Sequence, residues 1–173
     1  MRKAVFALMV GAATVIVVAG ENAPDAKLLG QLKTLFPSAT GFSAKEPDPP
    51  HYNAYIGDPK TKTVGGYVFW TTELEPLERG YDGPIKMLVG MDTKGILTGI
   101  IVVEHHEPYG DFSIQPPEFA LQFKGKSIRD PFKVGADIDA VSRASISVTS
   151  ASRAVRNSAR RVARALLTPE AVK

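Results

Sequence analysis

Hydrophobic residues recur at helical spacing in two parts of the chain, one towards each end. Residues 25–36 carry apolar side chains three or four positions apart, and Pro37 follows them, so we expect a short helix here. Towards the C-terminus, apolar side chains form one stripe of a longer helical pattern, and arginines fall on the opposite side. The stripe consists of Val148, Ala151, Val155, Ala159, Val162 and Leu166, and the arginines are Arg153, Arg156, Arg160 and Arg164. This pattern predicts a long C-terminal helix with one buried face.

Between these helices the pattern changes to the two-residue period of strands. Residues 52–56 and 63–71 are rich in aromatic and β-branched side chains, and a Gly-Asp-Pro-Lys turn separates them. Residues 85–91 and 96–104 form a second predicted hairpin around an Asp-Thr-Lys-Gly turn. Segment 96–104 is apolar on both of its faces, so we expect it to be covered on both sides and to be the central strand.

Proline and glycine mark the predicted loops. Residues 41–50 contain three prolines and are expected to form a loop. Residues 105–130 are also loop-rich, with a short helix over 117–123 that Gly125 closes. The sequence therefore predicts an α+β fold: a mainly antiparallel sheet of about four strands, with an N-terminal helix and a long C-terminal helix.

The first twenty residues have the composition of an export signal. Arg2 and Lys3 precede an uncharged, apolar run over residues 4–20, and small residues end it where a signal peptidase would cut. A retained anchor is the alternative, although a run of this length at about 1.5 Å per residue barely crosses a hydrocarbon core of roughly 30 Å. We therefore expect residues 1–20 to be a signal peptide or anchor, and residues 21–173 to be a single domain. The expected location is periplasmic or otherwise extracytoplasmic, with membrane attachment through residues 4–20 if the leader stays.

Charge and composition narrow the function further. The chain has no cysteine, which excludes thiolate catalysis, iron–sulfur ligation and thiolate zinc sites. Residues 21–140 carry twelve basic and seventeen acidic side chains, whereas residues 141–173 carry seven basic side chains and one acidic side chain. The arginine face of the last helix could bind nucleic acid or anionic lipid. Because the rest of the chain is acidic and the leader directs export, we expect a solvated face and no nucleic-acid partner.

Hydroxyl side chains cluster where the long helix is expected to begin. They are Ser142, Ser145, Ser147, Thr149 and Ser150. Backbone N–H groups at the start of a helix have no partner inside the helix, so such a segment attracts anions, phosphate above all. Serine and threonine are also favoured helix caps, so capping is the alternative function for these hydroxyls.

Asp139 and residues 142–147 resemble the attachment signature of the FMN-binding domain family. The family signature is an aspartate shortly before Ser/Thr-Gly-Ala-Thr and a further hydroxyl residue. In that family, a dedicated flavin transferase takes FMN from FAD and joins its phosphate to the motif threonine. The resemblance implies covalent FMN on Ser145, with Ser142, Arg143, Ala144 and Ser147 as further cofactor-binding residues. Two positions depart from the signature, because Arg143 stands where the family has glycine and Ser145 where it has threonine.

Residues 104–110, Glu-His-His-Glu-Pro-Tyr-Gly, resemble the His-x-Glu-(Thr)-Pro-Gly turn of the same family. Residues 80–85 and 35–40 are similar to the branch that includes the regulator of nitrous-oxide reduction. The resemblance implies that His105 and Glu107 shape the loop beside the flavin ring. Three interpretations remain open for these side chains: a metal site, general acid/base catalysis, and hydrogen bonds that hold the turn in one shape.

The family includes flavin subunits of the sodium-pumping quinone reductase and of Rnf complexes. The resemblance therefore implies an exported domain that holds one FMN and transfers electrons, as a carrier more than a stand-alone catalyst. The implied partners are a flavin transferase and a membrane redox complex or other electron-transfer protein. No nicotinamide-binding glycine motif is present, so a protein partner would supply the electrons. The alternative is a flavin-free periplasmic sensory or interaction module of the same fold, which Arg143 favours.

Overall fold

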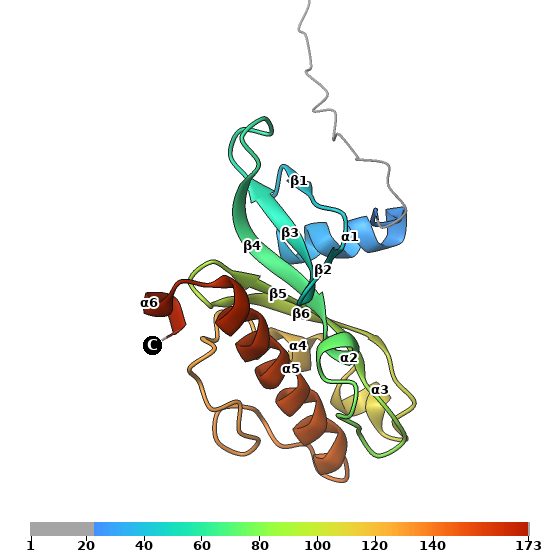
Figure 1. Ribbon diagram of the computed structural model, residues 1–173. Helices are drawn as coiled ribbons and strands as arrows, with labels where there is room; N and C mark the ends of the chain where they lie inside the picture. Colours follow the sequence, from blue (N-terminus) through green and yellow to red (C-terminus); the bar gives the residue numbers. More distant parts are fainter. Residues whose placement is uncertain (1–22, 173) are drawn as a thin grey trace, which may run out of the picture.

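The computed structural model describes residues 23–172, and the predicted leader lies outside these residues. Within this range an antiparallel sheet has the strand order β1-β3-β4-β5-β6, with β2 paired to β3 (Figure 1). The strands are β1 (Gly41–Phe42), β2 (Glu46–Pro47), β3 (Pro50–Ile56), β4 (Thr63–Trp70), β5 (Lys86–Asp92) and β6 (Leu97–Glu104). The helices are α1 (Ala26–Leu35), α2 (Thr71–Leu74), α3 (Gly110–Ser113), α4 (Pro117–Leu121), α5 (Ser145–Leu166) and α6 (Pro169–Val172). The α+β fold that the sequence predicts is confirmed, including the N-terminal helix, the short helix α4, the long C-terminal helix and both hairpins.

Helix α1 covers one face of the sheet. Its first turn is capped by Asp25, whose carboxylate accepts a hydrogen bond of 2.7 Å from the backbone N–H of Leu28. Leu32 and Leu35 then point into a small core and are 0% and 5% exposed. Leu88 of β5 belongs to the same core. The helical spacing in the sequence therefore marked the correct buried face.

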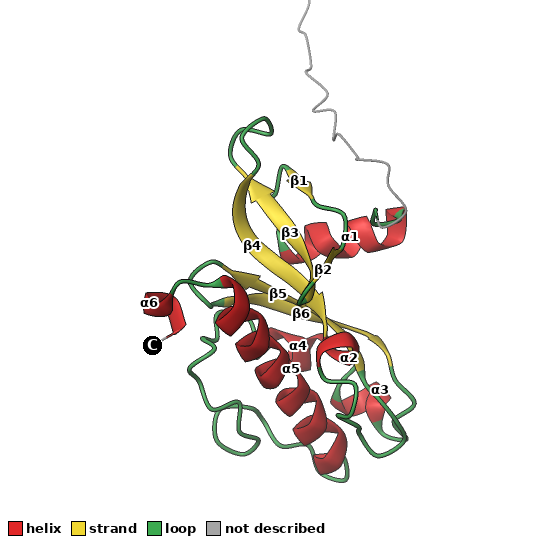
Figure 2. Cartoon of the chain, in the orientation of Figure 1, coloured by secondary structure: helices red, strands yellow, loops and turns green. Residues whose placement is uncertain are grey.

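Helix α5 covers the opposite face and builds the larger core (Figure 2). Its apolar stripe includes Val148 and Val155, which are both fully buried. They belong to the same core as Phe69 of β4 and Val89 of β5. Because Leu88 faces α1 while Val89 faces α5, β5 has the two-residue alternation of a strand covered on both sides.

The prediction that segment 96–104 is the central strand is wrong. Strand β6 pairs with β5 alone among the named strands and ends the strand order. It is still covered on both faces, because α4 contacts it from the side of the larger core and α1 from the other. Its free edge is partly closed by residues 125–128, where the N–H of Leu97 donates to the carbonyl of Lys126 at 2.8 Å. The apolar residues on both faces of this segment therefore reflect burial of both faces, and the strand lies at a sheet edge that a neighbouring loop partly covers.

Segment 41–50 also differs from the prediction. It contains the two short strands β1 and β2, which pair antiparallel with β3 at Gly41↔Tyr55 and Glu46↔His51. Prolines and short length hide such strands from a periodicity analysis. None of the helices between residues 23 and 172 is both long enough and apolar enough to cross a lipid bilayer.

Candidate functional site

A cleft of about 430 Å³ lies at the start of α5. Its lining residues are Tyr81, Pro108, Tyr109, Arg143, Ala144, Ser145, Ile146 and Ser147. Three segments that are far apart in the sequence therefore meet here: the loop before β5, the turn after β6, and the first turn of α5. Four of the seven predicted cofactor-binding residues line this cleft, whereas Ser142, His105 and Glu107 do not.

Apolar side chains that the sequence analysis did not assign to the site form much of its wall. Tyr81 is 69% exposed, Tyr109 44% and Ile146 56%. Phe112 is 67% exposed, and its ring centroid lies 5.9 Å from that of Tyr109. Exposed aromatic side chains at a cleft suit a flat, partly apolar ligand. Only the Gly-Tyr-Asp-Gly-Pro segment, already noted for its resemblance, carried a sequence signal for Tyr81.

The start of α5 is not capped by a hydroxyl. Ala144 occupies the N-cap position, and no side chain donates or accepts a cap hydrogen bond there. The first helical bond runs from the N–H of Val148 to the carbonyl of Ala144 at 3.0 Å. The serines therefore do not cap this helix in the structure. The first-turn N–H groups carry the positive end of the helix dipole.

The predicted serines differ sharply in exposure. Ser142 and Ser145 are exposed, and Ser145 is the first residue of α5. Ser147 is only 3% exposed, and its hydroxyl donates to the carboxylate of Glu107. Ser150 is 2% exposed and donates to Glu78 Oε1 at 3.0 Å. Of the two serines that line the cleft, Ser145 is thus the exposed one.

Arg143 has an unusual backbone conformation for a residue with a side chain. Its φ is 68°, in the left-handed region that favours glycine. Glycine is also what the FMN-binding signature has at this position, so the chain keeps the backbone shape while adding a guanidinium group. The Arg143 side chain is exposed at the cleft and makes no hydrogen bond or ion pair with any residue between 23 and 172.

Glu107 lies behind the cleft and is 6% exposed. Its Oε2 accepts from the N–H of Tyr81 at 2.9 Å and from the hydroxyl of Ser147, and its Oε1 accepts from the N–H of Asp82 at 3.0 Å. Burial by itself would raise the pKa of Glu107, but these hydrogen bonds and nearby His105 lower the pKa below its ordinary value. The side chain is therefore a carboxylate anion at neutral pH.

His105 supports the same turn. Its Nδ1 accepts from the N–H of Glu107 at 3.3 Å. The ring packs so closely on Gly110 that a Cβ at this glycine would lie 2.1 Å from the ring Cε1 atom. The neighbouring His106 is exposed. The contacts therefore favour the turn-shaping interpretation, and residues 23–172 contain no group of three or more His, Asp or Glu side chains arranged to hold a metal ion.

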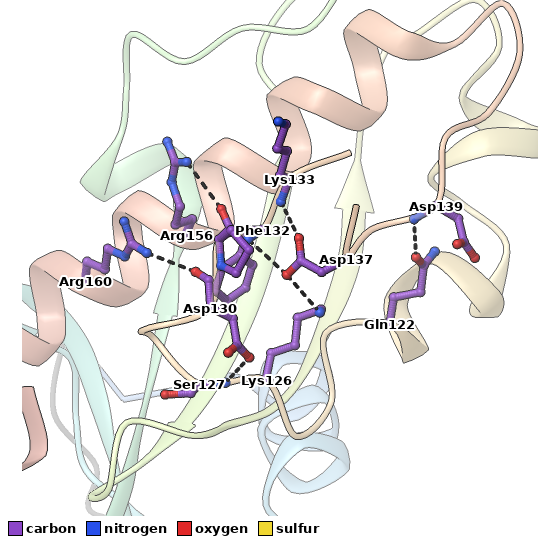
Figure 3. Close-up of polar contacts among 11 residues, drawn as sticks. Gln122, Lys126, Ser127, Asp130, Phe132, Lys133, Asp137, Asp139, Arg156 and Arg160 are labelled. Atoms are coloured by element: carbon purple, nitrogen blue, oxygen red, sulfur yellow. Dashed lines mark hydrogen bonds and ion pairs between the residues drawn. The ribbon is translucent and has the colours of Figure 1, made fainter. Parts of the chain in front are cut away.

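Further along α5, Arg153, Arg156 and Arg160 bind the protein's own groups. Arg160 donates to the carbonyl of Ile128 at 2.8 Å. It also donates to the carbonyl of Asp130 at 2.9 Å, and Arg156 donates to the carbonyl of Pro131 at 3.4 Å (Figure 3). Arg153 forms two hydrogen bonds of 2.6 Å with the carboxylate of Glu78. These contacts fasten the flanking loops to α5.

Asp137 forms hydrogen bonds within the loop whose carbonyls the α5 arginines contact. Its carboxylate accepts from the backbone N–H groups of Phe132 and Lys133 and from Lys126 Nζ, the first and last at 3.1 Å (Figure 3). Desolvation would raise the pKa of Asp137, but these donors lower the pKa below its ordinary value. Asp139, the aspartate of the resemblance, is exposed, and its backbone N–H donates to the side-chain oxygen of Gln122 at 2.7 Å.

Comparison with known proteins relates part of the chain to a flavin-binding family. Residues 80–160 match the family model of the FMN-binding domain, a range that contains every residue lining the cleft. The chain is also similar to a subunit of the ion-translocating oxidoreductase complex of Haemophilus influenzae, with 43% identity in strain Rd and 41% in strain PittEE, each over 51 residues. Each match covers 30% of this chain and 23% of the relative, so the chain covers less than a quarter of these relatives' length. The part of the chain that forms the cleft is therefore similar to the FMN-binding domain family, over residues 80–160.

Proposed function

We propose that this protein is an exported electron-transfer domain whose FMN is joined by its phosphate to Ser145 as a phosphoester. The carrying observation is the contrast between two serines of one cleft. Ser145 is exposed at the first position of α5, whereas Ser147 is buried and donates to Glu107. The exposed serine is also the one that the attachment signature marks.

The groups around Ser145 suit the phosphate of FMN. First-turn N–H groups attract anions, and the guanidinium of Arg143 can donate charged hydrogen bonds to phosphate oxygens. Ser142, which precedes Arg143, is exposed but does not line the cleft. The apolar wall formed by Tyr81, Tyr109 and Ile146 suits the ring system of the same molecule. The chemistry of this donor set and wall therefore fits both ends of FMN.

Attachment would be a transfer from FAD that a flavin transferase catalyses. The Oγ atom of Ser145 forms a bond to the phosphorus of the riboflavin phosphate, and the bond from that phosphorus to the adenylate oxygen breaks. AMP leaves, and the hydroxyl proton of Ser145 passes to a base on the transferase. No redox change occurs in this step.

The bound cofactor would supply the electron-transfer chemistry, and the chain's own residues would hold and orient it. The proposed partner is a membrane redox complex, since the similar Haemophilus proteins are named as subunits of an ion-translocating oxidoreductase complex. The proposed export rests on the composition of residues 1–20. Cell fractionation of the full chain, with the leader intact or deleted, tests the location separately from the cofactor.

Co-expression with and without a flavin transferase tests the attachment. Wild-type protein made with the transferase is expected to remain yellow after denaturation and to gain the mass of FMN less one water. The Ser145→Ala variant is expected to lose that added mass, whereas Ser142→Ala, which removes the neighbouring exposed hydroxyl, should keep it. Protein that is colourless under both conditions would contradict the proposal.

Arg143 favours a second candidate function, a flavin-free sensory or interaction module. A side chain where the family has glycine adds bulk at the site of attachment, and Arg143 lines the cleft. Capture of a membrane partner by colourless protein, with no gain in capture when FMN is added, would support this alternative.

A further inference from the structure

We infer that Glu107 is a positioning residue for FMN attachment, because its carboxylate ties the Tyr81 wall of the cleft to the first turn of α5. This inference rests on the proposed function. It gives Glu107, which does not line the cleft, a role in attachment in place of the role beside the flavin ring that the resemblance implied. Its expected role is to fix where the Ser145 hydroxyl stands relative to the opposite wall.

The contacts of Glu107 join segments that are distant in the chain. Tyr81 and Asp82 precede Glu107 by 26 and 25 positions, and Ser147 follows it by 40. A single carboxylate thus accepts two N–H groups from the loop and one hydroxyl from the helix. Moving either wall away would leave a buried carboxylate short of donors, which is costly. The two walls are therefore held at a fixed separation.

The backbone around Glu107 is shaped to allow these contacts. A Cβ on Gly80 would lie 2.4 Å from Glu107 Oε1, so a side chain at this position would displace the carboxylate. Gly110 makes the corresponding close approach to the ring of His105 on the other side of the turn. Glycine at these two positions therefore lets the backbone pack directly against Glu107 and His105.

Glu78 provides a matched comparison within the same molecule. Glu78 lies in the loop before β5 that also contains Tyr81 and Asp82. Its Oε1 accepts a hydrogen bond of 3.0 Å from the hydroxyl of Ser150, a buried serine of α5. Ser150 lies three residues beyond Ser147, and neither Glu78 nor Ser150 lines the cleft. Like Glu107, Glu78 is therefore a carboxylate that joins the loop before β5 to α5 through a buried serine. Unlike Glu107, it makes no bond to a described residue that lines the cleft.

The isosteric variant Glu107→Gln separates positioning from general damage. One carboxylate oxygen becomes an NH₂ group, which conflicts with an N–H donor of Tyr81 or Asp82. We expect its rate of FMN loading by a flavin transferase and FAD to fall by about tenfold to a hundredfold, as for a misplaced reacting group. Hydrogen exchange at the backbone amides of Tyr81 and Asp82 should quicken in the same variant. Glu78→Gln should load close to the wild-type rate and leave exchange at these amides unchanged.

The single variant Ser147→Ala keeps the inference testable if Glu107→Gln is poorly folded. Ser147→Ala removes the same tie from the helix side and is expected to slow loading as well. Combining Ser147→Ala with Glu107→Gln should slow loading little more than Glu107→Gln alone, because both break one network.

Wild-type loading rates in Glu107→Gln, or equal slowing in Glu78→Gln, would overturn the inference while leaving Ser145 as the acceptor. If wild-type protein takes no FMN at all, the proposed function fails instead. The amide-exchange measurement still decides in that case: unchanged exchange at Tyr81 and Asp82 in Glu107→Gln would also overturn the positioning role.

Discussion

Arg143, just before α5, and the arginines along the flank of α5 lie in opposite surroundings. Arg156 and Arg160 donate to backbone carbonyls of the neighbouring loop, and Arg153 forms an ion pair with Glu78. Arg143 stands at the cleft without such a partner among the described residues, in a backbone conformation that costs free energy. The Arg143 side chain is therefore available to a ligand at the cleft, whereas Arg153, Arg156 and Arg160 are held by groups of the protein itself. The contacts of Arg153, Arg156 and Arg160 stabilise the fold, whereas the start of α5 is where we propose that FMN binds.

The largest expected effect comes from removing the carboxylate of Asp137, in the loop that the arginines of α5 contact. Asp137→Ala removes the acceptor for two backbone N–H groups and for Lys126. We expect the free energy of unfolding to fall by about 2–3 kcal/mol, measured by urea denaturation. Asp139→Ala is the matched control, because the structure shows only a backbone hydrogen bond for Asp139, and its stability should stay close to wild type. Equal losses in the two variants would contradict the account of the flank.

A smaller loss is expected at Arg160. Arg160→Ala leaves the carbonyls of Ile128 and Asp130 without their donor, which should lower the unfolding free energy by about 1–2 kcal/mol. FMN loading measured well below the melting temperature should not change, because Arg160 does not line the cleft. A stable Arg160→Ala protein with impaired loading would show that flank and cleft are not separate.

The corresponding change at the cleft should have the opposite sign. Arg143→Gly relieves a left-handed backbone, so the unfolding free energy should rise by up to about 1 kcal/mol, while FMN binds less tightly. Lys62→Gly is the control, because Lys62 is also exposed with a positive φ of 48° but lies in the β3–β4 turn. It should gain similar stability without any change in FMN binding. A loss of stability in Arg143→Gly would indicate that the arginine supports the fold.

The smallest effect concerns the pH dependence of stability. The pKa values of Asp137 and Glu107 are lower in the folded protein than their ordinary values of 3.8 and 4.5, because their hydrogen bonds outweigh the effect of burial. Both carboxylates therefore stabilise the fold at pH values above these ordinary pKa values. This stabilisation is lost as the pH falls through the folded-state pKa. Urea titrations should show a decline below about pH 4–5 that is shallower in Asp137→Asn than in wild type. Identical slopes in the two proteins would contradict the lowered pKa of Asp137.

The elements that the sequence predicted best are those whose burial has a regular period. The stripe through Val148 and Val155 identified the buried face of α5, and alternation identified the two hairpins. The position of β6 was missed because an apolar run reports cover on both faces, which α1 and α4 provide at the sheet edge. Periodicity carries no information about the order of strands in a sheet.

The site was predictable only where a motif stood close together in the chain. The Ser142–Ser147 segment could be assigned from its resemblance, and the structure brings most of it to one cleft. Tyr81 and Tyr109 reach the same cleft through tertiary contacts, which local sequence does not encode. The bond between Glu107 and Ser147 likewise joins residues 40 positions apart, so their shared role emerges only from the fold.

Peptide mapping of yellow, denatured protein tests the central claim most directly. Trypsin cleaves after Arg143 and Arg153, so Ser145 and Ser142 fall on different peptides. The account predicts that the mass of FMN less one water lies on the peptide of residues 144–153, and that fragmentation assigns it to Ser145. An added mass on the peptide that ends at Arg143, on another hydroxyl of residues 144–153, or on no peptide would contradict it.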